Sequence, residues 1–212
     1  EGNITYEVLP GLFKKLCSKA RKISISGFKT SWKDLSYFKM SLGGKNRSDI
    51  SDYFINNNQI GLGWGGNVDL QHLKTESFKD FKTKFYELNP RDVGGSSFNV
   101  QAAFAFKRMK IGDVVVVSKG NHIIDAIGIV TSDYIYDGDN PFEFYHTRTV
   151  NWIAKDLNVE PEKFIRKNLS QQAIYEFYKE DVKLEAFEDF NTSSTELNQP
   201  HVLIIDEINR GN

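Results

Sequence analysis

Two closely spaced runs of β-branched residues constrain the fold of this chain more than any other feature of its sequence. Residues 114–117 are four consecutive valines, and residues 123–130 read Ile-Ile-Asp-Ala-Ile-Gly-Ile-Val. Both runs are too short and too β-branched to favour helices. The Ser-Lys-Gly-Asn segment between them is typical of a turn that closes an antiparallel hairpin. Because apolar residues occupy consecutive positions, both faces should be covered, which predicts a hairpin in the middle of a sheet.

Shorter patterns on both sides of this hairpin predict the rest of the domain. Short apolar runs beside turn residues predict strands at residues 37–42, 59–63 and 147–153. Amphipathic patterns predict helices outside the sheet at residues 49–56, 78–88 and 99–108. Helical character is also expected from residue 155 onwards, with helices at residues 171–178 and 181–190. The expected fold class is α+β, a small curved β-sheet or barrel flanked by helices.

The totals of the sequence restrict the class of protein. A length of 212 residues allows one large domain or two small ones. The formal net charge of -1 argues against a uniformly basic surface but leaves room for a local basic face. Cys17 is the single cysteine, so no internal disulfide is expected. No signal peptide and no apolar run of about 20 residues is recognisable. We therefore expect a cytoplasmic protein without a membrane partner.

An amphipathic pattern precedes the sheet. Within residues 1–30, apolar side chains recur at helical spacing between lysines and arginines, at Leu9, Leu12, Phe13 and Leu16. A basic helix of this kind either contacts nucleic acid or a membrane surface, or packs its apolar face on the domain. Residues 1–35 are therefore expected to be a helical extension in front of a core domain at residues 36–154.

Trp64 stands out because glycines flank it on both sides, in the segment Gly63-Trp64-Gly65-Gly66. A tryptophan in a core rarely needs such neighbours. Glycines beside a tryptophan allow another group to approach its ring closely. This context favours a ring displayed beside a cavity, and ordinary core packing is the alternative.

A phosphate-binding loop is suggested by Gly43-Gly44-Lys45, but the motif is incomplete. The first glycine of G-x-x-x-x-G-K-[ST] is replaced by Lys39, and Asn46 follows the lysine where Ser or Thr is required. This segment is predicted to be a turn.

Metal and nuclease chemistry are not favoured either. His72, His122, His146 and Cys17 lack the spacing of metal ligands, so no metal site is expected. The segment 180–183, Glu-Asp-Val-Lys, contains the acid-x-Lys triplet used by metal-dependent nucleases, but it has no evident partner carboxylate and lies on an expected helix.

The last twelve residues, HVLIIDEINRGN, form a pattern of a different kind. An apolar run followed by Asp206 and Glu207 is how a buried parallel strand presents two carboxylates at its end. In phosphate-loop nucleotidases such an Asp serves Mg²⁺ and the Glu polarises water. No phosphate loop precedes it in this chain, so nothing would hold the phosphates. We expect no nucleotide hydrolysis and no cofactor for these 212 residues.

Two parts of the sequence resemble known families. The segment LIIDEINRGN resembles the Walker B segment of McrB-type GTPases, an AAA+ branch found in modification-dependent restriction systems. Residues 37–153 resemble the EVE-like domain of the PUA superfamily that precedes the motor in many such proteins. The pieces that carry this resemblance are YFKMSLGGKN, IGLGWGGNVDL, FKRMKIGDVVVVSKGNHIIDAIGIVTSDYIYD and HTRTVNWI.

This resemblance implies a fold and a site. Relatives, including the YTH readers of methylated adenine in RNA, are small twisted barrels that hold a modified base between aromatic side chains. Trp64 matches the tryptophan that walls the pocket. Other base-pocket positions are placed by analogy, namely Ser41, Asn99, Ser118, Tyr134, Tyr136 and Trp152. Backbone contacts are expected from Lys39, Lys45, Arg47, Lys119 and Arg148. Residues 155–190 become a helical extension, and residues 191–212 a linker and Walker B-like fragment of an incomplete AAA+ module.

The resemblance also implies a function. The chain is expected to be the specificity module of a modification-dependent restriction system, which binds DNA and holds a flipped modified base. A McrC-like nuclease would be the partner, and GTP or ATP with Mg²⁺ would act only in a complete parent motor. A reader of modified RNA and a protein-interaction domain without a base pocket stay open as alternatives.

Overall fold

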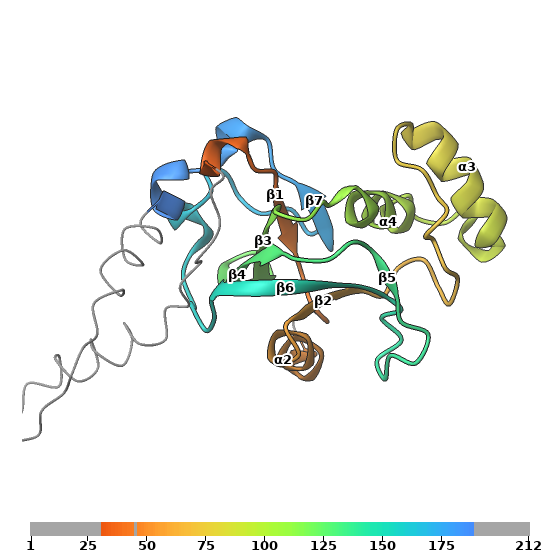
Figure 1. Cartoon of the computed structure of the whole chain (residues 1–212), viewed down its shortest axis with the longest axis horizontal. Coiled ribbons are helices and arrows are strands. Elements are labelled where there is room, and N and C mark those ends of the chain that lie inside the picture. The colour runs from red at the N-terminus through yellow and green to blue at the C-terminus, as the bar shows by residue number, and fades with distance from the viewer. Residues whose placement is uncertain (1–30, 45, 189–212) are drawn as a thin grey trace, which may run out of the picture.

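The computed structural model describes residues 31–44 and 46–188 (Figure 1). The helix predicted within residues 1–30, Lys45, and the Walker B-like segment with Asp206 and Glu207 lie outside the described residues. Within them, no helix is long and apolar enough to cross a membrane.

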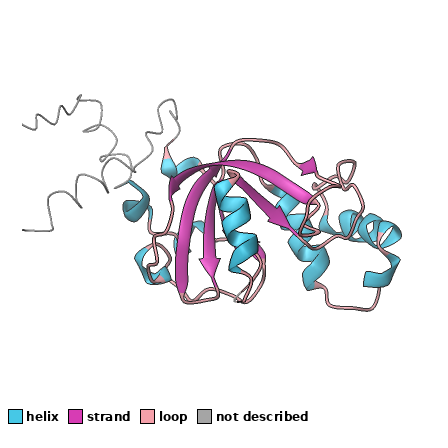
Figure 2. Cartoon of the chain, turned by 90° about the horizontal axis from the view of Figure 1, so that it is seen from below, coloured by secondary structure: helices cyan, strands magenta, loops and turns pink. Residues whose placement is uncertain are grey.

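A curled, mixed sheet forms the centre of the fold, as Figure 2 shows. Its strands lie in the order β2-β6-β4-β3-β1-β7, and β5 pairs with β6 outside this path. Strands β1 and β3 are parallel, and the other pairs are antiparallel. The strands are β1 (Tyr37–Met40), β2 (Gln59–Leu62), β3 (Val114–Lys119), β4 (Ile123–Val130), β5 (Ile135–Tyr136), β6 (His146–Ala154) and β7 (Ile174–Glu176). The expected mixed α+β class with a curved sheet is confirmed.

The hairpin β3–β4 lies in the middle of this sheet, as its sequence predicts. Strand β1 pairs with the outer edge of β3, and β6 pairs with that of β4. The four valines at 114–117 are fully buried. Near the turn the register shifts: Val117 lies opposite Ala126 and Ser118 opposite Ile124, which leaves Asp125 as an extra residue of β4. A bulge of this type redirects side chains beside the turn.

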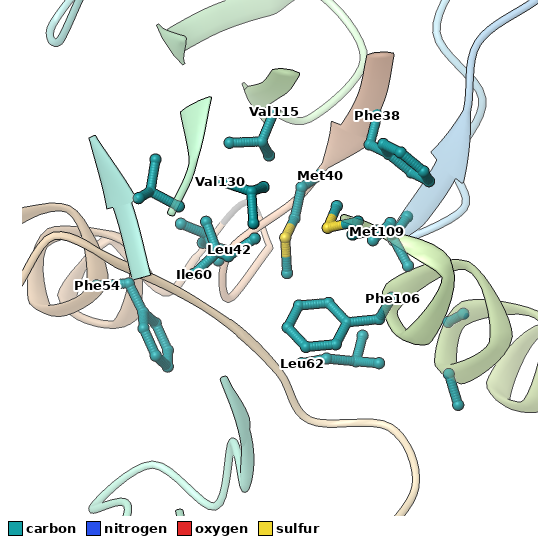
Figure 3. Close-up of a cluster of buried hydrophobic side chains, with 14 of the residues drawn as sticks. Phe38, Met40, Leu42, Phe54, Ile60, Leu62, Phe106, Met109, Val115 and Val130 are labelled. Atoms are coloured by element: carbon teal, nitrogen blue, oxygen red, sulfur yellow. The ribbon is translucent and has the colours of Figure 1, made fainter. Parts of the chain in front are cut away.

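Two apolar cores cover the two faces of the sheet. Helices α2 (Ser48–Asn56), α3 (Phe78–Leu88) and α4 (Phe98–Arg108) contribute to the first core, which also contains Phe38, Met40 and Val115 (Figure 3). The second core contains Tyr37, Val114 and Val116 from the same strands. Residues that precede β1, such as Trp32, and residues that follow β6, such as Phe164, cover this face. Successive residues of a strand point to opposite faces, so burial on both sides explains the continuous apolar runs. The three predicted helices are confirmed.

The helix predicted at residues 171–178 is wrong. This segment contains β7, which pairs antiparallel with β1 and is therefore part of the central sheet. Its neighbours extend the pairing: the Ser41 N–H donates to the Ala173 carbonyl at 2.8 Å, and the Phe177 N–H donates to the Tyr37 carbonyl at 2.8 Å. Without this segment the outer edge of buried β1 would lack hydrogen-bond partners. Farther on, residues 179–181 form a 3-10 helix, and residues 184–188 are helical.

Candidate nucleic-acid interface

A groove of about 690 Å³ lies where the central strands end. Its lining comes from the loops after β1 and β2, the β3–β4 turn and the segment before β7: Ser41, Gly43, Gly44, Trp64, residues 119–123, Gln171 and Ala173. None of these lining residues is an aspartate or a glutamate. Lys119 and His122 are the basic residues among them. The groove therefore favours a ligand that is neutral or negatively charged over a cation.

Trp64 forms part of this groove and is 47% exposed, which is the displayed position that its sequence context favours. The flanking glycines have a physical reason that the sequence does not reveal. A Cβ at Gly65, whose φ is 114°, would lie 2.6 Å from Nε2 of His146. A Cβ at Gly63 would lie 3.2 Å from the ring of Phe144. The glycines thus allow the loop to pack closely on β6 and its preceding turn, and this packing presents the indole at the surface.

A second hollow of about 410 Å³ shares Trp64 with the groove. Its lining includes residues 63–67, residues 88–92 and Asn99. Nδ2 of Asn99 donates to Oδ1 of Asp92 at 3.3 Å. Asn99 therefore belongs to this second hollow and not to the groove that contains Ser41.

Ser41, which lines the groove, meets two buried polar residues, Lys39 and Ser118. Nζ of Lys39 donates to Oγ of Ser41 at 2.6 Å and to the carbonyl oxygen of Gln172 at 2.5 Å. Oγ of Ser41 lies 3.3 Å from Oγ of Ser118. The structure thus brings the predicted residues Ser41 and Ser118 together, and adds Lys39 as their neighbour.

Lys39 does not occupy the surface position that a phosphate contact requires. It is 1% exposed, and its ammonium group is held by Oγ of Ser41 and the carbonyl oxygen of Gln172. Burial lowers the pKa of its ammonium group to about 8. The expected contact of Lys39 with a nucleic-acid backbone is therefore corrected: this side chain is buried and supports Ser41.

Lys119 lies at the rim of the groove, where a contact to a phosphate is sterically open. Its Nζ is 2.9 Å from Oδ1 of Asp125, the extra residue of the bulge. The Lys119 side chain is half-exposed and the Asp125 side chain is buried. The buried carboxylate orients the lysine, and an ammonium group with three donors can contact a second anion as well.

Tyr134 and Tyr136 belong to a packed cluster beside the second hollow. The Leu70 N–H donates to Oη of Tyr134 at 3.0 Å, and the Tyr134 hydroxyl lies 2.7 Å from Nδ1 of His146. The Tyr136 hydroxyl donates to Oδ1 of Asn67, which lines the second hollow. Burial raises the pKa of Tyr134 and lowers the pKa of His146 to about 4. Neither tyrosine lines the groove beside Ser41.

Arg148 and Trp152 are both buried, which corrects their expected contacts with nucleic acid. Arg148 is 2% exposed, and its guanidinium donates to the carbonyl oxygens of Phe106, Lys107 and Ser132 at 3.1–3.2 Å. Trp152 is 1% exposed and lies opposite Gly128 in the β4–β6 pair. The alternation of polar and apolar residues along β6 does not indicate that both faces of this strand are covered.

Arg47 is the last of the expected phosphate contacts that the structure describes. It is exposed and forms a salt bridge with Asp49 at 2.8 Å. Asn121, His122 and Gln171 also line the groove, although the sequence did not identify them as site residues. A turn asparagine or histidine carries no signal of its own. Gln171 was missed because its segment was expected to be a helix outside the sheet.

Comparison with known proteins identifies a family and remotely similar solved structures. A family model described as "Domain of unknown function (DUF8426)" matches residues 38–178, from β1 to just past β7. No curated protein matches the chain. Among solved structures, it is similar to the YTH domain of the Zygosaccharomyces rouxii MRB1 protein in complex with N6-methyladenosine RNA. The identity is 12%, the match covers 82% of this chain and 90% of that chain, and the TM-score is 0.35.

Proposed function

The chain belongs to DUF8426, a family of domains of unknown function, and we propose that this domain is a nucleic-acid reader that holds one unstacked base against Trp64. One observation carries the proposal. A half-exposed tryptophan stands in a groove whose lining includes Lys119 and His122 and contains no carboxylate. An aromatic surface beside positive charge is the combination that binds bases and their phosphates in single strands.

The size of the groove supports a ligand of this kind. Its volume of about 690 Å³ lies within the range of roughly 300–1,000 Å³ that is typical of small-molecule sites. A single base with its sugar fits such a volume, and a duplex does not. A base from a duplex therefore has to leave the stack before it enters.

The energies of the separate steps are compatible with reading an extruded base. Extrusion of a paired base costs a few kcal/mol. Stacking on one aromatic side chain returns roughly 1–3 kcal/mol. The difference has to come from phosphate contacts, for which Lys119 is the positioned candidate at the rim. A mispaired, damaged or single-stranded base leaves its stack at lower cost.

We extend the proposal to DNA that carries a modified base, as the specificity module of a modification-dependent restriction system. This extension rests on the sequence resemblance to EVE-like domains and on the Walker B-like segment with Asp206 and Glu207. In such a system a complete McrB-type motor would bind GTP or ATP with Mg²⁺, and a McrC-like nuclease would cleave. The described domain would supply recognition and no catalysis.

A binding panel tests the proposal. Fluorescence anisotropy would compare one duplex sequence with a central cytosine, methylcytosine, hydroxymethylcytosine or methyladenine, together with the corresponding RNA. We expect one modified DNA duplex to bind at least tenfold more tightly than the unmodified one. A preference for modified RNA would assign the domain to RNA. Equal binding of all probes, or no binding, would contradict base reading and favour a protein-interaction domain.

The matched control is a second exposed aromatic residue. Phe98 is 59% exposed and lines neither the groove nor the second hollow. Phe98→Ala should leave the preference for the modified probe unchanged, and Trp64→Ala should remove it. If both substitutions act alike, Trp64 has no special contact with the base.

A further inference from the structure

The hydroxyl groups of Ser41 and Ser118 have more hydrogens than the described residues can accept. Oγ of Ser41 accepts a hydrogen bond from Nζ of Lys39 at 2.6 Å, so the hydroxyl hydrogen of Ser41 has to point elsewhere. Oγ of Ser118 has one hydrogen-bond partner among the described residues, which is Oγ of Ser41. Only one of the two hydroxyls can donate along the 3.3 Å contact between them. The other hydrogen therefore needs an acceptor from outside the described residues.

Burial determines which hydroxyl contributes the free hydrogen. Ser118 is buried and does not line the groove, whereas Ser41 is partly exposed and does. Both hydrogens are used when Ser118 donates to Ser41 and Ser41 donates into the groove. In this arrangement Oγ of Ser41 accepts from Lys39 and from Ser118, and its own O–H faces the ligand.

The charge of Lys39 strengthens this donor. No carboxylate of the described residues forms a salt bridge with Lys39, whose ammonium group is held by Ser41 and by the carbonyl oxygen of Gln172. A buried cation without a counterion is stabilised by electron-rich atoms nearby. A cation that donates to Oγ also polarises the Ser41 hydroxyl towards its next acceptor, as in other hydrogen-bonded chains.

We propose that Lys39, Ser118 and Ser41 form a donor relay that makes the groove select a base with a carbonyl oxygen over a base with an amino group at the same position. The relay rests on the proposed function, because it presupposes that a base occupies the groove. Ser41 would be the residue that contacts the base. Lys39 and Ser118 would be positioning residues that act through it.

The Ser41 hydroxyl, as a hydrogen-bond donor, determines which base the groove prefers. A base that stacks on Trp64 directs an edge at the residues around the ring, and Ser41 is one of the lining residues that can meet this edge. A carbonyl oxygen accepts the Ser41 hydrogen, whereas an amino group places a second donor against it. A site built to make one hydrogen bond disfavours an analogue that leaves its polar group unpaired.

The test uses pairs of bases that differ in this group. Single-stranded oligonucleotides would carry one base in an otherwise abasic strand, uracil against cytosine and hypoxanthine against adenine. A single strand removes the cost of extrusion, and anisotropy measures its affinity. We expect the carbonyl member of at least one pair to bind about tenfold more tightly, which corresponds to about 1.4 kcal/mol.

Variants separate the relay from general effects on the groove. Ser41→Ala should reduce the preference for the carbonyl base to below about twofold, because the hydrogen bond that discriminates between the two bases is lost. Ser118→Ala and Lys39→Met leave the groove lining unchanged and should reduce the preference part of the way. Ser96→Ala, a change of an exposed serine outside the groove, is the control and should keep it. Thermal unfolding of each variant checks that it is folded.

The possible outcomes separate the relay from the proposed function. A carbonyl preference that Ser41→Ala removes, while Trp64→Ala still weakens both ligands, supports the relay. Equal affinity for both members of each pair, with binding that depends on Trp64, overturns the relay and leaves the reader function standing. A preference that survives Ser41→Ala, or one for the amino base, also overturns the relay. Affinities that Trp64→Ala does not change overturn the proposed function, and the relay with it.

Discussion

Nε of Arg148, near the start of β6, donates to the carbonyl oxygen of Phe106 in the last turn of α4 at 3.2 Å. The same guanidinium donates to the carbonyl oxygen of Lys107, so one buried cation satisfies two carbonyls that the helix itself leaves without partners. Its positive charge also lies at the negative end of the helix dipole. Arg148 thus joins α4 to the sheet.

Replacing Arg148 should therefore affect stability and leave recognition intact. We expect Arg148→Met to lower the free energy of unfolding by roughly 2–4 kcal/mol, since buried carbonyl oxygens lose their donors. Urea denaturation measures this loss. The salt dependence of nucleic-acid binding by the folded fraction should not change. A fully stable variant with a weaker salt dependence would instead indicate a phosphate contact for Arg148.

Gly128 should tolerate no side chain. A Cβ at this position would lie 2.3 Å from Cγ1 of Val150 and 2.8 Å from the ring of Trp152. Relief of such overpacking distorts β6, and we expect Gly128→Ala to destabilise the domain by roughly 1–3 kcal/mol or more. Thermal unfolding monitored by circular dichroism measures the effect. The matched control is Gly138→Ala, because the nearest atom to that Cβ is 3.4 Å away in the Tyr136 ring. Equal melting temperatures for the two variants would contradict this account of the β4–β6 contact.

Removal of the Trp64 indole should weaken binding to a modified duplex by roughly 1–3 kcal/mol, the scale of one stacking contact. Binding to the unmodified duplex rests on lysine and arginine and should hardly change. The measurement is a pair of anisotropy titrations for wild type and Trp64→Ala. Because the ring is half-exposed, the variant should fold. Unfolding, or an equal loss for both duplexes, would show that Trp64 has a structural role.

Lys119 should show the opposite pattern. Lys119→Ala should weaken binding to the modified and the unmodified duplex alike, because a phosphate contact carries no sequence information. The slope of log K against log salt should become shallower by about 1. Titrations at several salt concentrations measure this slope. Since Asp125 would lose its partner, stability has to be measured in parallel. An unchanged slope would exclude a phosphate contact by Lys119.

The domain should lose stability in acid through His146. Burial lowers the pKa of this imidazole from 6.5 to about 4 in the folded state. Between these two values the unfolded chain binds the proton and the folded chain does not, so stability falls as the pH falls. The loss should approach about 3 kcal/mol near pH 4. Urea denaturation at pH 4–7 would measure it, and His146→Gln should flatten the profile. A variant with the same pH dependence as wild type would assign the loss to other groups.

Local sequence was sufficient for the elements that depend on neighbouring residues. The β3–β4 hairpin follows from two β-branched runs around a polar turn. Helices α2, α3 and α4 follow from their apolar spacing. The exposure of Trp64 agrees with its glycine context.

The tertiary structure decided the features that depend on distant partners. Residues 174–176 became a strand because the free edge of β1 needed backbone partners, although their own pattern resembled a helix. Lys39, Arg148 and Trp152 were expected at the interface but are buried, because segments distant in the sequence cover both faces of the sheet. The alternation within one strand determines which side chains share a face. Whether that face meets water or a core depends on the segments, distant in the sequence, that pack against it.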